Sequence, residues 1–169
     1  NGICHELVMT NIEEPKGIGN STTLSKDLTS ISEIEKILYQ ISENVEIGLR
    51  KQKKYANVIV VTLKDKYFKN YSHQRKLKNP TNLTNEIYQV SCELLKEMWD
   101  HNPVRLVGIR LDQLTDFALH QVSFFEDFET RKKENELESV VDEIKEKFGV
   151  GSIKKASLMN KKIKKKYQE

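Results

Sequence analysis

The chain has 169 residues, which is long enough for one domain of ordinary size plus a tail. Charged residues make up 31% of the sequence and apolar residues 37%, which predicts a folded protein with a polar surface. No apolar run approaches the roughly 20 residues of a membrane span, and the opening residues lack a signal-peptide pattern. The 2 cysteines suggest no disulfide framework. These features exclude membrane-spanning and disulfide-stapled classes, and they favour a reducing, cytoplasmic compartment.

A strand and a long helix open the predicted domain. Residues 16–24 form a short strand whose backbone is left bare by Gly17 and Gly19. The pair Ser30 and Glu33 then matches a capping box and starts a helix over about residues 30–52. Apolar residues at spacings of three and four give this helix one buried face: Ile31, Ile34, Leu38, Ile41 and Val45. The opposite face is expected to be solvated and carries Glu35, Lys36, Glu43 and Glu46.

A hairpin, a second helix and a fourth strand follow. The apolar run 58–63 and the alternating residues 71–77 are predicted strands, joined by the polar residues 65–70. Pro80 precedes a helix whose buried stripe is Ile87, Val90, Leu94, Leu95 and Met98, and residues 104–111 are the last strand. The predicted class is therefore α+β, in the split β-α-β-β-α-β order. Four strands form an antiparallel-type sheet with both helices on one face, and the free face can display Lys64, Lys66, Arg75 and Arg110.

Charge blocks suggest the domain boundaries. Residues 1–15 are an acidic linker, and residues 16–115 form the folded core. Residues 116–130 hold four acids and no Lys or Arg, and are expected to be a flexible linker. Residues 131–169 hold twelve bases and seven acids, and are expected to form a C-terminal helix and basic tail. The apolar stripe of that helix is Leu137, Val140, Val141, Ile144 and Phe148, and Gly149 closes it.

No catalytic or metal-ligating constellation is found. The histidines are scattered at positions 5, 73, 101 and 120, and neither cysteine has a partner at metal-ligand spacing. The segment Gly17-Ile18-Gly19 lacks the third glycine and the context of a dinucleotide site. The neighbouring Asp142 and Glu143 diverge on a helix and are unsuited to share a metal. A binding role is favoured over a catalytic one.

The basic hairpin is the strongest binding signal. From Arg50 to Lys78 the chain carries ten Lys or Arg and one Asp, in a protein whose net charge is +3. Such a concentration is typical of polyphosphate binding, although a solvated face that prevents edge-to-edge association explains it equally well. Hydroxyls and bare amides near the cations would also donate to phosphate oxygens. Few aromatic residues alternate with these charges, which favours the backbone of a duplex over stacking on single strands.

A Phe pair in the acidic block is the second signal. Gln121-Val122-Ser123-Phe124-Phe125 lies where periodicity is lost. Exposed Phe pairs are costly in water, so the two rings either fold back on the core or bind a partner's pocket. For an isolated pentapeptide the core explanation is favoured.

Several segments together resemble the little finger domain of Y-family translesion DNA polymerases of the UmuC, ImpB/MucB/SamB and UvrX type. The matching segments are, in order, KGIGNSTTL, VVTLK, SHQRKLKNPTN, LLKEMW, PVRLVGIRLDQL and QVSFF. The last of these stands where bacterial members carry a peptide that docks on the sliding clamp. Asn1-Gly2-Ile3 is similar to the end of the family's thumb, and LESVVDEIKEKFG, residues 137–149, resembles a C-terminal helix of some members. Gly17 and Ser21 depart from the family's usual Ser and Glu.

The resemblance implies a non-catalytic region that grips primer-template duplex DNA through backbone phosphates and docks on the DNA sliding clamp, without membrane contact. Mg²⁺ would be used in a palm domain of the parent polymerase, so no cofactor is expected in this chain. The residues implied for DNA are Lys16, Gly17, Gly19, Asn20, Thr22, Thr23, Lys64, Lys66, Ser72, His73, Arg75 and Lys76. Those implied for the clamp are Gln121, Val122, Ser123, Phe124 and Phe125.

Two rival functions use the same topology. An RNA-binding module would need an aromatic-rich signature on the central strands, which is missing here. A pure protein-interaction domain would use residues 121–125 alone, and its positive charge would serve only solubility.

Overall fold

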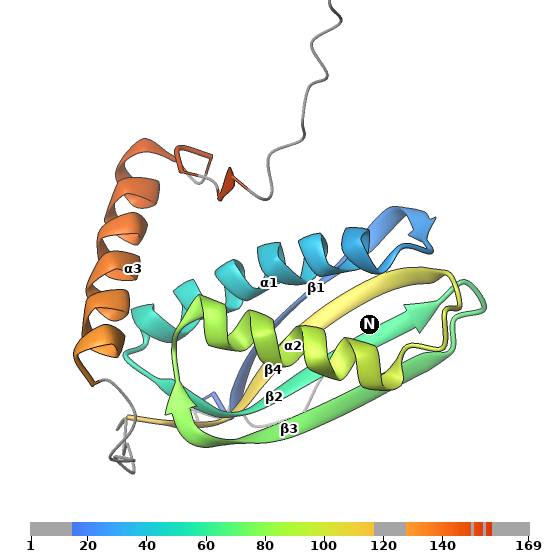
Figure 1. The fold of residues 1–169 in the computed structure, drawn as a ribbon, viewed down its shortest axis with the longest axis horizontal. Helices are drawn as coiled ribbons and strands as arrows, with labels where there is room; N and C mark the ends of the chain where they lie inside the picture. The colour runs from blue at the N-terminus through green and yellow to red at the C-terminus, as the bar shows by residue number, and fades with distance from the viewer. Residues whose placement is uncertain (1–14, 117–127, 150, 154, 157–169) are drawn as a thin grey trace, which may run out of the picture.

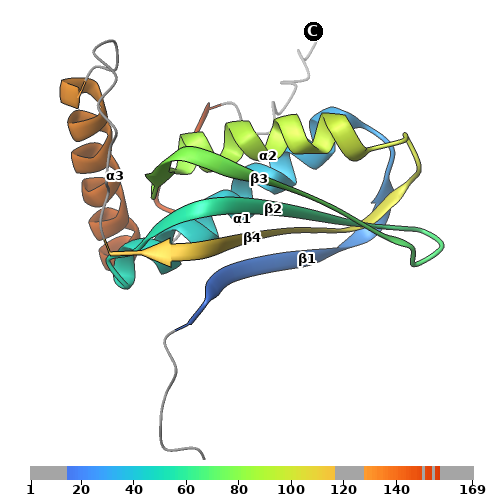
Figure 2. The same cartoon turned by 90° about the horizontal axis from the view of Figure 1, so that it is seen from below.

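A computed structural model describes residues 15–116, 128–149, 151–153 and 155–156. Its elements are β1 (Gly17–Leu28), α1 (Ile31–Lys51), β2 (Tyr55–Asp65), β3 (Asn70–Thr81), α2 (Thr84–Met98), β4 (Val104–Thr115) and α3 (Phe128–Phe148). The strands form one antiparallel sheet in the order β1-β4-β2-β3. Both α1 and α2 lie on one face of this sheet (Figures 1 and 2), α1 over β1 and β4, α2 over β2 and β3. The α+β class and the split β-α-β-β-α-β order are confirmed.

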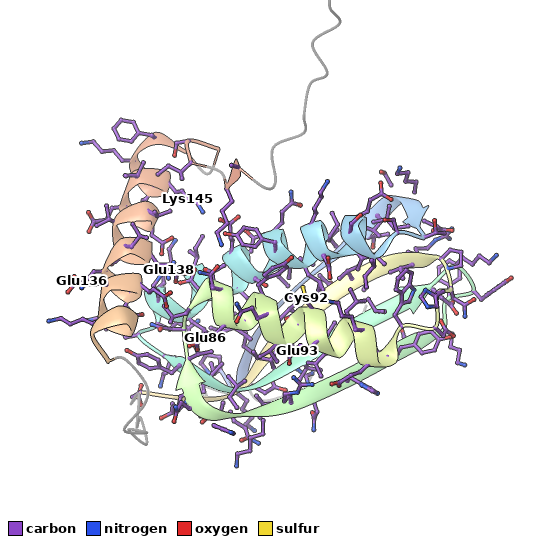
Figure 3. The ribbon with its side chains drawn as sticks, viewed as in Figure 1. Glu86, Cys92, Glu93, Glu136, Glu138 and Lys145 are labelled. Carbon is purple, nitrogen blue, oxygen red and sulfur yellow. The ribbon has the colours of Figure 1, made fainter. Side chains whose placement is uncertain are left out.

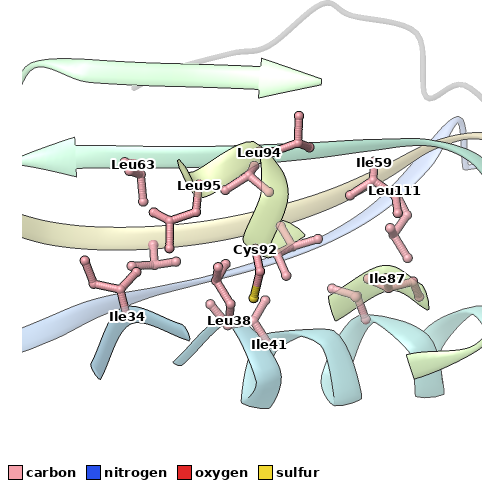
Figure 4. Packing of buried hydrophobic residues seen from close by; sticks show 14 of the residues in the cluster. Ile34, Leu38, Ile41, Ile59, Leu63, Ile87, Cys92, Leu94, Leu95 and Leu111 are labelled. Carbon is pink, nitrogen blue, oxygen red and sulfur yellow. The ribbon is translucent and has the colours of Figure 1, made fainter. Parts of the chain in front are cut away.

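The core lies between the sheet and these two helices (Figure 4). Alternate residues of β2 and β4 point into it, and each of the central ones is at most 2% exposed: Ile59, Val61, Leu63, Val107, Ile109 and Leu111. Helical spacing brings Ile34, Leu38 and Ile41 of α1 and Ile87, Leu94 and Leu95 of α2 against them. Cys92 is a buried thiol in this cluster. Because both helices cover the same face, no helix within the described ranges lies on the opposite face of the sheet.

The ends of the elements differ somewhat from expectation. Strand β1 continues to Leu28, which pairs with Val104 after an irregularity in the register, and β4 continues to Thr115. At the start of α1, Ser30 occupies the N-cap position, but its side chain makes no capping hydrogen bond. Its hydroxyl lies 2.9 Å from the Ser32 hydroxyl instead, so the predicted capping box does not form. None of the helices in the described ranges is long and apolar enough to cross a membrane.

The third helix, α3, lies beside the C-terminal end of α1 and the N-terminal end of α2 (Figure 1). Arg50 at the end of α1 contacts two carboxylates of α3: its Nη1 lies 2.6 Å from Glu138 and its Nε 2.6 Å from Asp142. The same guanidinium pairs with Glu46, and Lys145 lies 2.7 Å from Glu43. Glu138 also accepts a hydrogen bond from the Thr84 N–H, at 3.2 Å, and so caps α2. Polar contacts therefore attach α3 to the domain.

Two predictions about charged and apolar faces are wrong here. Glu46, expected on a solvated face, is 1% exposed, because Arg50 pairs with it and the Thr84 hydroxyl of α2 donates to it at 3.1 Å. Conversely, three residues of the stripe predicted for α3 are in solvent, with Leu137 64%, Val140 52% and Phe148 68% exposed, whereas Val141 and Ile144 are half-buried. Figure 3 shows Glu138 and Lys145 on the side of α3 that faces α1 and α2, with Glu136 on the outer side. The helix thus docks through its ion-pairing face.

Candidate nucleic-acid interface

The helix-free side of the sheet, here called the open face, is a regular grid of side chains. Residues paired across antiparallel strands point to the same side, and successive residues alternate sides. The registers therefore define four rows, each crossing β1, β4, β2 and β3 in turn. The rows are Gly17-Asp112-Val58-Lys76, Gly19-Arg110-Val60-Gln74, Ser21-Gly108-Thr62-Ser72 and Thr23-Leu106-Lys64-Asn70. Their side chains include Lys64, Lys76 and Arg110 and a single carboxylate.

That carboxylate, Asp112, is already paired. Its Oδ2 lies 3.0 Å from Nε and 2.8 Å from Nη2 of Arg110, whose side chain is 61% exposed. The pair fixes the Arg110 guanidinium above the middle of the sheet while leaving most of it in water. An exposed pair of this kind adds little stability, so its guanidinium remains available to a stronger anionic partner.

Two hollows flank Arg110 on the open face. One, of about 540 Å³, is lined by Gly19, Ser21, Thr62 and Lys64, with Asn70 at its end. The other, of about 670 Å³, includes Lys16, Gln74 and Asp112 among its lining residues. The first hollow combines hydroxyls, an ammonium and a guanidinium over backbone without side chains. All these groups can donate hydrogen bonds to phosphate oxygens.

The glycines of β1 also have a packing role. A Cβ on Gly19 would lie 3.2 Å from Cγ of Arg110, and one on Gly17 would lie 2.8 Å from the Leu111 carbonyl oxygen. On β4, a Cβ at Gly108 would lie 3.0 Å from Cβ of Ser21. These glycines allow β1 and β4 to approach closely, and the same lack of side chains forms the floor of the first hollow.

The sequence-predicted DNA residues divide between the two faces. Gly17, Gly19, Thr23, Lys64, Ser72 and Lys76 lie on the open face. Asn20 and Thr22 alternate to the other side of the edge strand β1, with Ile18, which packs on the core. Lys16 lies just before β1, and Lys66 lies in the turn after β2. The sequence prediction did not include Thr62, Gln74 and Asn70, which also lie on the open face. Strand alternation could have identified them, because they lie an even number of residues before Lys64 or Lys76.

Arg75 and His73 point to the helix-covered side, opposite to expectation. They pair across the sheet with Ile59 and Val61, which are core residues. The Arg75 guanidinium forms ion pairs with Glu93 and Glu97 of α2. These carboxylates outweigh the desolvation that would lower the Arg75 pKa, and the net effect is a raised pKa. Both residues therefore lie outside the open face.

The turn between β2 and β3, residues 66–69, is organised by Asp65. Its carboxylate accepts hydrogen bonds from the Tyr67 N–H at 2.8 Å, the Lys69 N–H at 3.0 Å and the Tyr71 hydroxyl at 3.2 Å. Burial alone would raise the Asp65 pKa, but the hydrogen bonds from Lys69, Tyr67 and Tyr71 outweigh it and hold the pKa below its usual value. The ionised form of Asp65 therefore stabilises the folded turn.

Replacing Asp65 with Asn should lower the urea midpoint of unfolding at neutral pH, because the acceptor loses its charge. Since the folded-state pKa lies below the unfolded one, the stabilisation is complete above about pH 4 and is lost as pH falls through the folded pKa. The difference between Asp65→Asn and the parent chain should therefore shrink in acid. A difference that is constant across pH would contradict this role.

The predicted clamp peptide, Gln121 to Phe125, lies outside the described residues. Within the described ranges, no group of three or more His, Cys, Asp or Glu could hold a metal ion. The open face is thus the candidate site, and its chemistry is that of hydrogen-bond donation and positive charge.

Comparison with known proteins identifies the family. Residues 15–124 match the model of the impB/mucB/samB family C-terminal domain. The chain belongs to this family. DNA polymerase IV of Clostridium acetobutylicum is 37% identical over 161 residues, covering 95% of this chain and 40% of that protein. DNA polymerase IV 2 of Bacillus subtilis is 32% identical over 162 residues, covering 93% of this chain and 39% of that protein. The chain therefore spans about 40% of the length of these relatives.

Solved structures agree with the impB/mucB/samB assignment at the level of the fold. The complex of the beta-clamp processivity factor with the little finger domain of PolIV matches with a TM-score of 0.51 and 20% identity, covering 65% of this chain and 99% of that one. The insertion ternary complex of Dbh DNA polymerase matches with a TM-score of 0.51 and 21% identity, covering 57% of this chain and 28% of that one. These likenesses show that the chain has the fold of a little finger domain.

Proposed function

We propose that this chain is the non-catalytic part of a bacterial translesion polymerase that grips duplex DNA through backbone phosphates. The observation that carries the proposal is the open face, where Lys64, Lys76 and Arg110 surround hydroxyls and glycine backbone. No helix covers this side of the sheet in the described ranges, so a ligand as broad as a duplex can reach all four strands. An RNA-binding role on this topology is not favoured, because the open face presents no aromatic side chain.

Contacts of this chemistry fix position without reading sequence. Phosphate oxygens accept from ammonium, guanidinium, hydroxyl and amide groups on any DNA. The grid offers all four kinds of donor, from its cations, its hydroxyl side chains and the backbone at its glycines. We therefore expect duplexes of different sequence to bind with similar affinity, as a polymerase that moves along its template requires.

Binding should fall steeply with salt. If about four phosphates are neutralised, log K should decrease with log[salt] with a slope of roughly −3 to −4. Fluorescence anisotropy of a labelled duplex, titrated with the 169-residue chain at several salt concentrations, measures this slope. Single-stranded RNA in the same titration is the comparison, and it should bind more weakly. A flat salt dependence, or no duplex binding at low salt, would rule out the proposed grip.

We further propose that Gln121 to Phe125 docks on the sliding clamp. The segment follows β4, which ends at Thr115, and the related little finger domain of PolIV was solved in complex with a clamp. The Gln side chain would anchor by hydrogen bonds and the two Phe rings would fill an apolar pocket. Replacing Phe124 and Phe125 with Ala should abolish clamp binding in surface plasmon resonance and leave the duplex affinity unchanged. Clamp binding that survives this double substitution would refute the docking role.

The chemistry of the parent enzyme belongs elsewhere under this proposal. A DNA polymerase transfers nucleotides with divalent metal ions held by carboxylates. We assign that step, and its Mg²⁺, to a palm domain outside this chain, in line with the 40% of the relatives' length that the chain covers.

A further inference from the structure

The turn between β2 and β3 presents two aromatic rings to solvent. Tyr67 is 71% exposed and Phe68 is 63% exposed, although both are large side chains that are costly to hydrate. The turn extends beyond the end of the sheet, at the end opposite α3 (Figure 2). No other part of the described structure buries these rings. Two explanations are a partner that covers them in a complex and a turn that is mobile.

The tip is held in place. Besides the three hydrogen bonds to the Asp65 carboxylate, the Phe68 N–H donates to the Asp65 carbonyl at 3.0 Å and the Lys66 N–H to the Pro103 carbonyl at 3.0 Å. Phe68 has a φ of 66°, a left-handed conformation that a bulky residue adopts only when its surroundings enforce it. The Arg105 guanidinium lies 5.2 Å from the centre of the Phe68 ring and is itself held by Asp27. Both rings are therefore presented by a pre-ordered scaffold.

The charge around the rings selects the kind of partner. Lys66 and Lys69 flank them, and the one acid of this segment, Asp65, is buried and already bonded. Lys64 and Asn70, which pair with each other, are the last row of the open face and line its first hollow. At about 3.3 Å per residue, the turn begins within roughly 10 Å of that row. A chain of phosphates lying on the open face can thus continue directly to the two rings.

We propose that Tyr67 and Phe68 stack on unpaired bases where a duplex held on the open face gives way to single strand. The inference rests on the proposed duplex grip and adds to it a preference for a junction. Aromatic rings among cations bind single strands because every base has a stacking face and the cations hold the phosphates. A protein pocket would also accept two aromatic rings, but it would not need the flanking lysines.

Three DNA ligands test the proposal with the 169-residue chain: a blunt duplex, the same duplex with a single-stranded overhang, and that duplex with an abasic overhang. The abasic overhang keeps the phosphates and removes the bases. The base-bearing overhang should bind about fivefold to tenfold tighter than the abasic one. The double variant Tyr67→Ala, Phe68→Asn should lose this difference and keep its affinity for the blunt duplex; Asn tolerates the left-handed backbone at position 68. Phe148→Ala, which removes a ring 68% exposed on α3, is the matched control and should change nothing.

The outcomes separate the two proposals. If the parent chain binds the blunt duplex but treats both overhangs alike, the stacking inference is wrong while the duplex grip stands, and the rings are left for a protein contact. If the double variant retains the preference, stacking by these two rings is equally ruled out. If no ligand binds at low salt, the duplex grip itself fails, and the junction preference fails with it.

Discussion

Replacing Lys64, Lys76 and Arg110 with glutamate is expected to weaken duplex binding on the order of 100-fold at low salt. The three cations lie in three different rows of the open face, so under the proposed grip they would contact phosphates over most of its length. Neutralising them with glutamine should reduce the magnitude of the salt slope by about 3, or about 1 per lost contact. Anisotropy titrations of one labelled duplex against the parent and both triple variants measure both effects.

The matched control reverses three lysines away from the open face. Lys36 lies on the exposed side of α1, and Lys132 and Lys133 are exposed on α3. Glutamate at these positions changes the net charge by the same amount but removes no predicted contact. Its duplex affinity should fall much less than that of the open-face variant. Equal losses would show that only total charge matters, and that the open face has no special role.

Replacing Arg50 with Met is expected to destabilise the domain by about 3 kcal/mol. Arg50 is the common partner of Glu46, Glu138 and Asp142, and Glu46 is 1% exposed. Its loss leaves a buried carboxylate without its cation, which costs far more than an exposed pair would. The same change removes the principal attachment of α3. Urea unfolding followed by circular dichroism measures the loss of stability. The rate of proteolysis between the domain and α3 measures the loss of the α3 attachment.

A second substitution checks the cause. The double variant Glu46→Met, Arg50→Met removes both buried charges, so most of the lost stability should return, as buried pairs replaced by apolar side chains often show. Duplex affinity should stay unchanged in both variants, because Arg50 lies in the last turn of α1, on the helix-covered side of the sheet, where it contacts α3. A double variant no more stable than Arg50→Met alone would mean that the loss comes from packing and not from an unpaired carboxylate.

Burial of Glu138 adds a detail to this contact. Desolvation, which raises the pKa, outweighs the Thr84 hydrogen bond and the Arg50 charge, which lower it, and the net pKa is raised. Burying the ionised Glu138 carboxylate therefore costs desolvation free energy, which the Arg50 charge and the Thr84 hydrogen bond offset only in part. Because the pKa of Glu138 is higher in the docked helix than in a free one, protonation of Glu138 favours docking. The docking of α3 should therefore weaken as pH rises from the pKa of the free carboxyl through that of the docked carboxyl.

The sequence was sufficient for the elements that local patterns specify. Spacings of three and four predicted α1 and α2, and the apolar run 58–63 predicted β2. The split β-α-β-β-α-β order could then be predicted from the sequence of these elements, because short connections between neighbouring elements allow few topologies. The resemblance to the little finger domain predicted the family, and the match of residues 15–124 to the impB/mucB/samB C-terminal domain confirmed that prediction.

The facing of β3 was harder to predict. Alternation places Arg75 on the same face as Tyr71 and Leu77, the apolar residues of this strand, and both of these pack against the core. The positive charge of Arg75 favoured exposure, although this apolar pair indicated the opposite facing. The cross-strand pairing of Arg75 with Ile59 decides it, and Glu93 and Glu97 of α2 then accept the guanidinium. Arg75 therefore stabilises the domain, whereas Lys76 lies on the open face of this strand.

The burial of Glu46 depended on contacts distant in sequence. Its position on a polar helical face predicted solvent. In the fold, however, the Thr84 hydroxyl of α2 donates to Glu46 at 3.1 Å, and Arg50, which is held by Glu138 and Asp142 of α3, pairs with it. No short-range sequence pattern links Arg50 to its partners Glu138 and Asp142, because they lie far away in the sequence. The exposed stripe of α3 has the same origin, because the ion pairs, and not the apolar side chains, set the face by which it docks.

The guanidinium signals of the arginines test the central claim most directly. In nuclear magnetic resonance spectra that resolve each Arg Nε–Hε pair, a short duplex is titrated into the isotope-labelled chain. Arg110, exposed on the open face, should shift with added duplex, whereas Arg50 and Arg75, paired on the helix side, should not. Shifts at Arg50 and Arg75 with an unmoved Arg110 would place the DNA on the other side of the sheet and contradict the account.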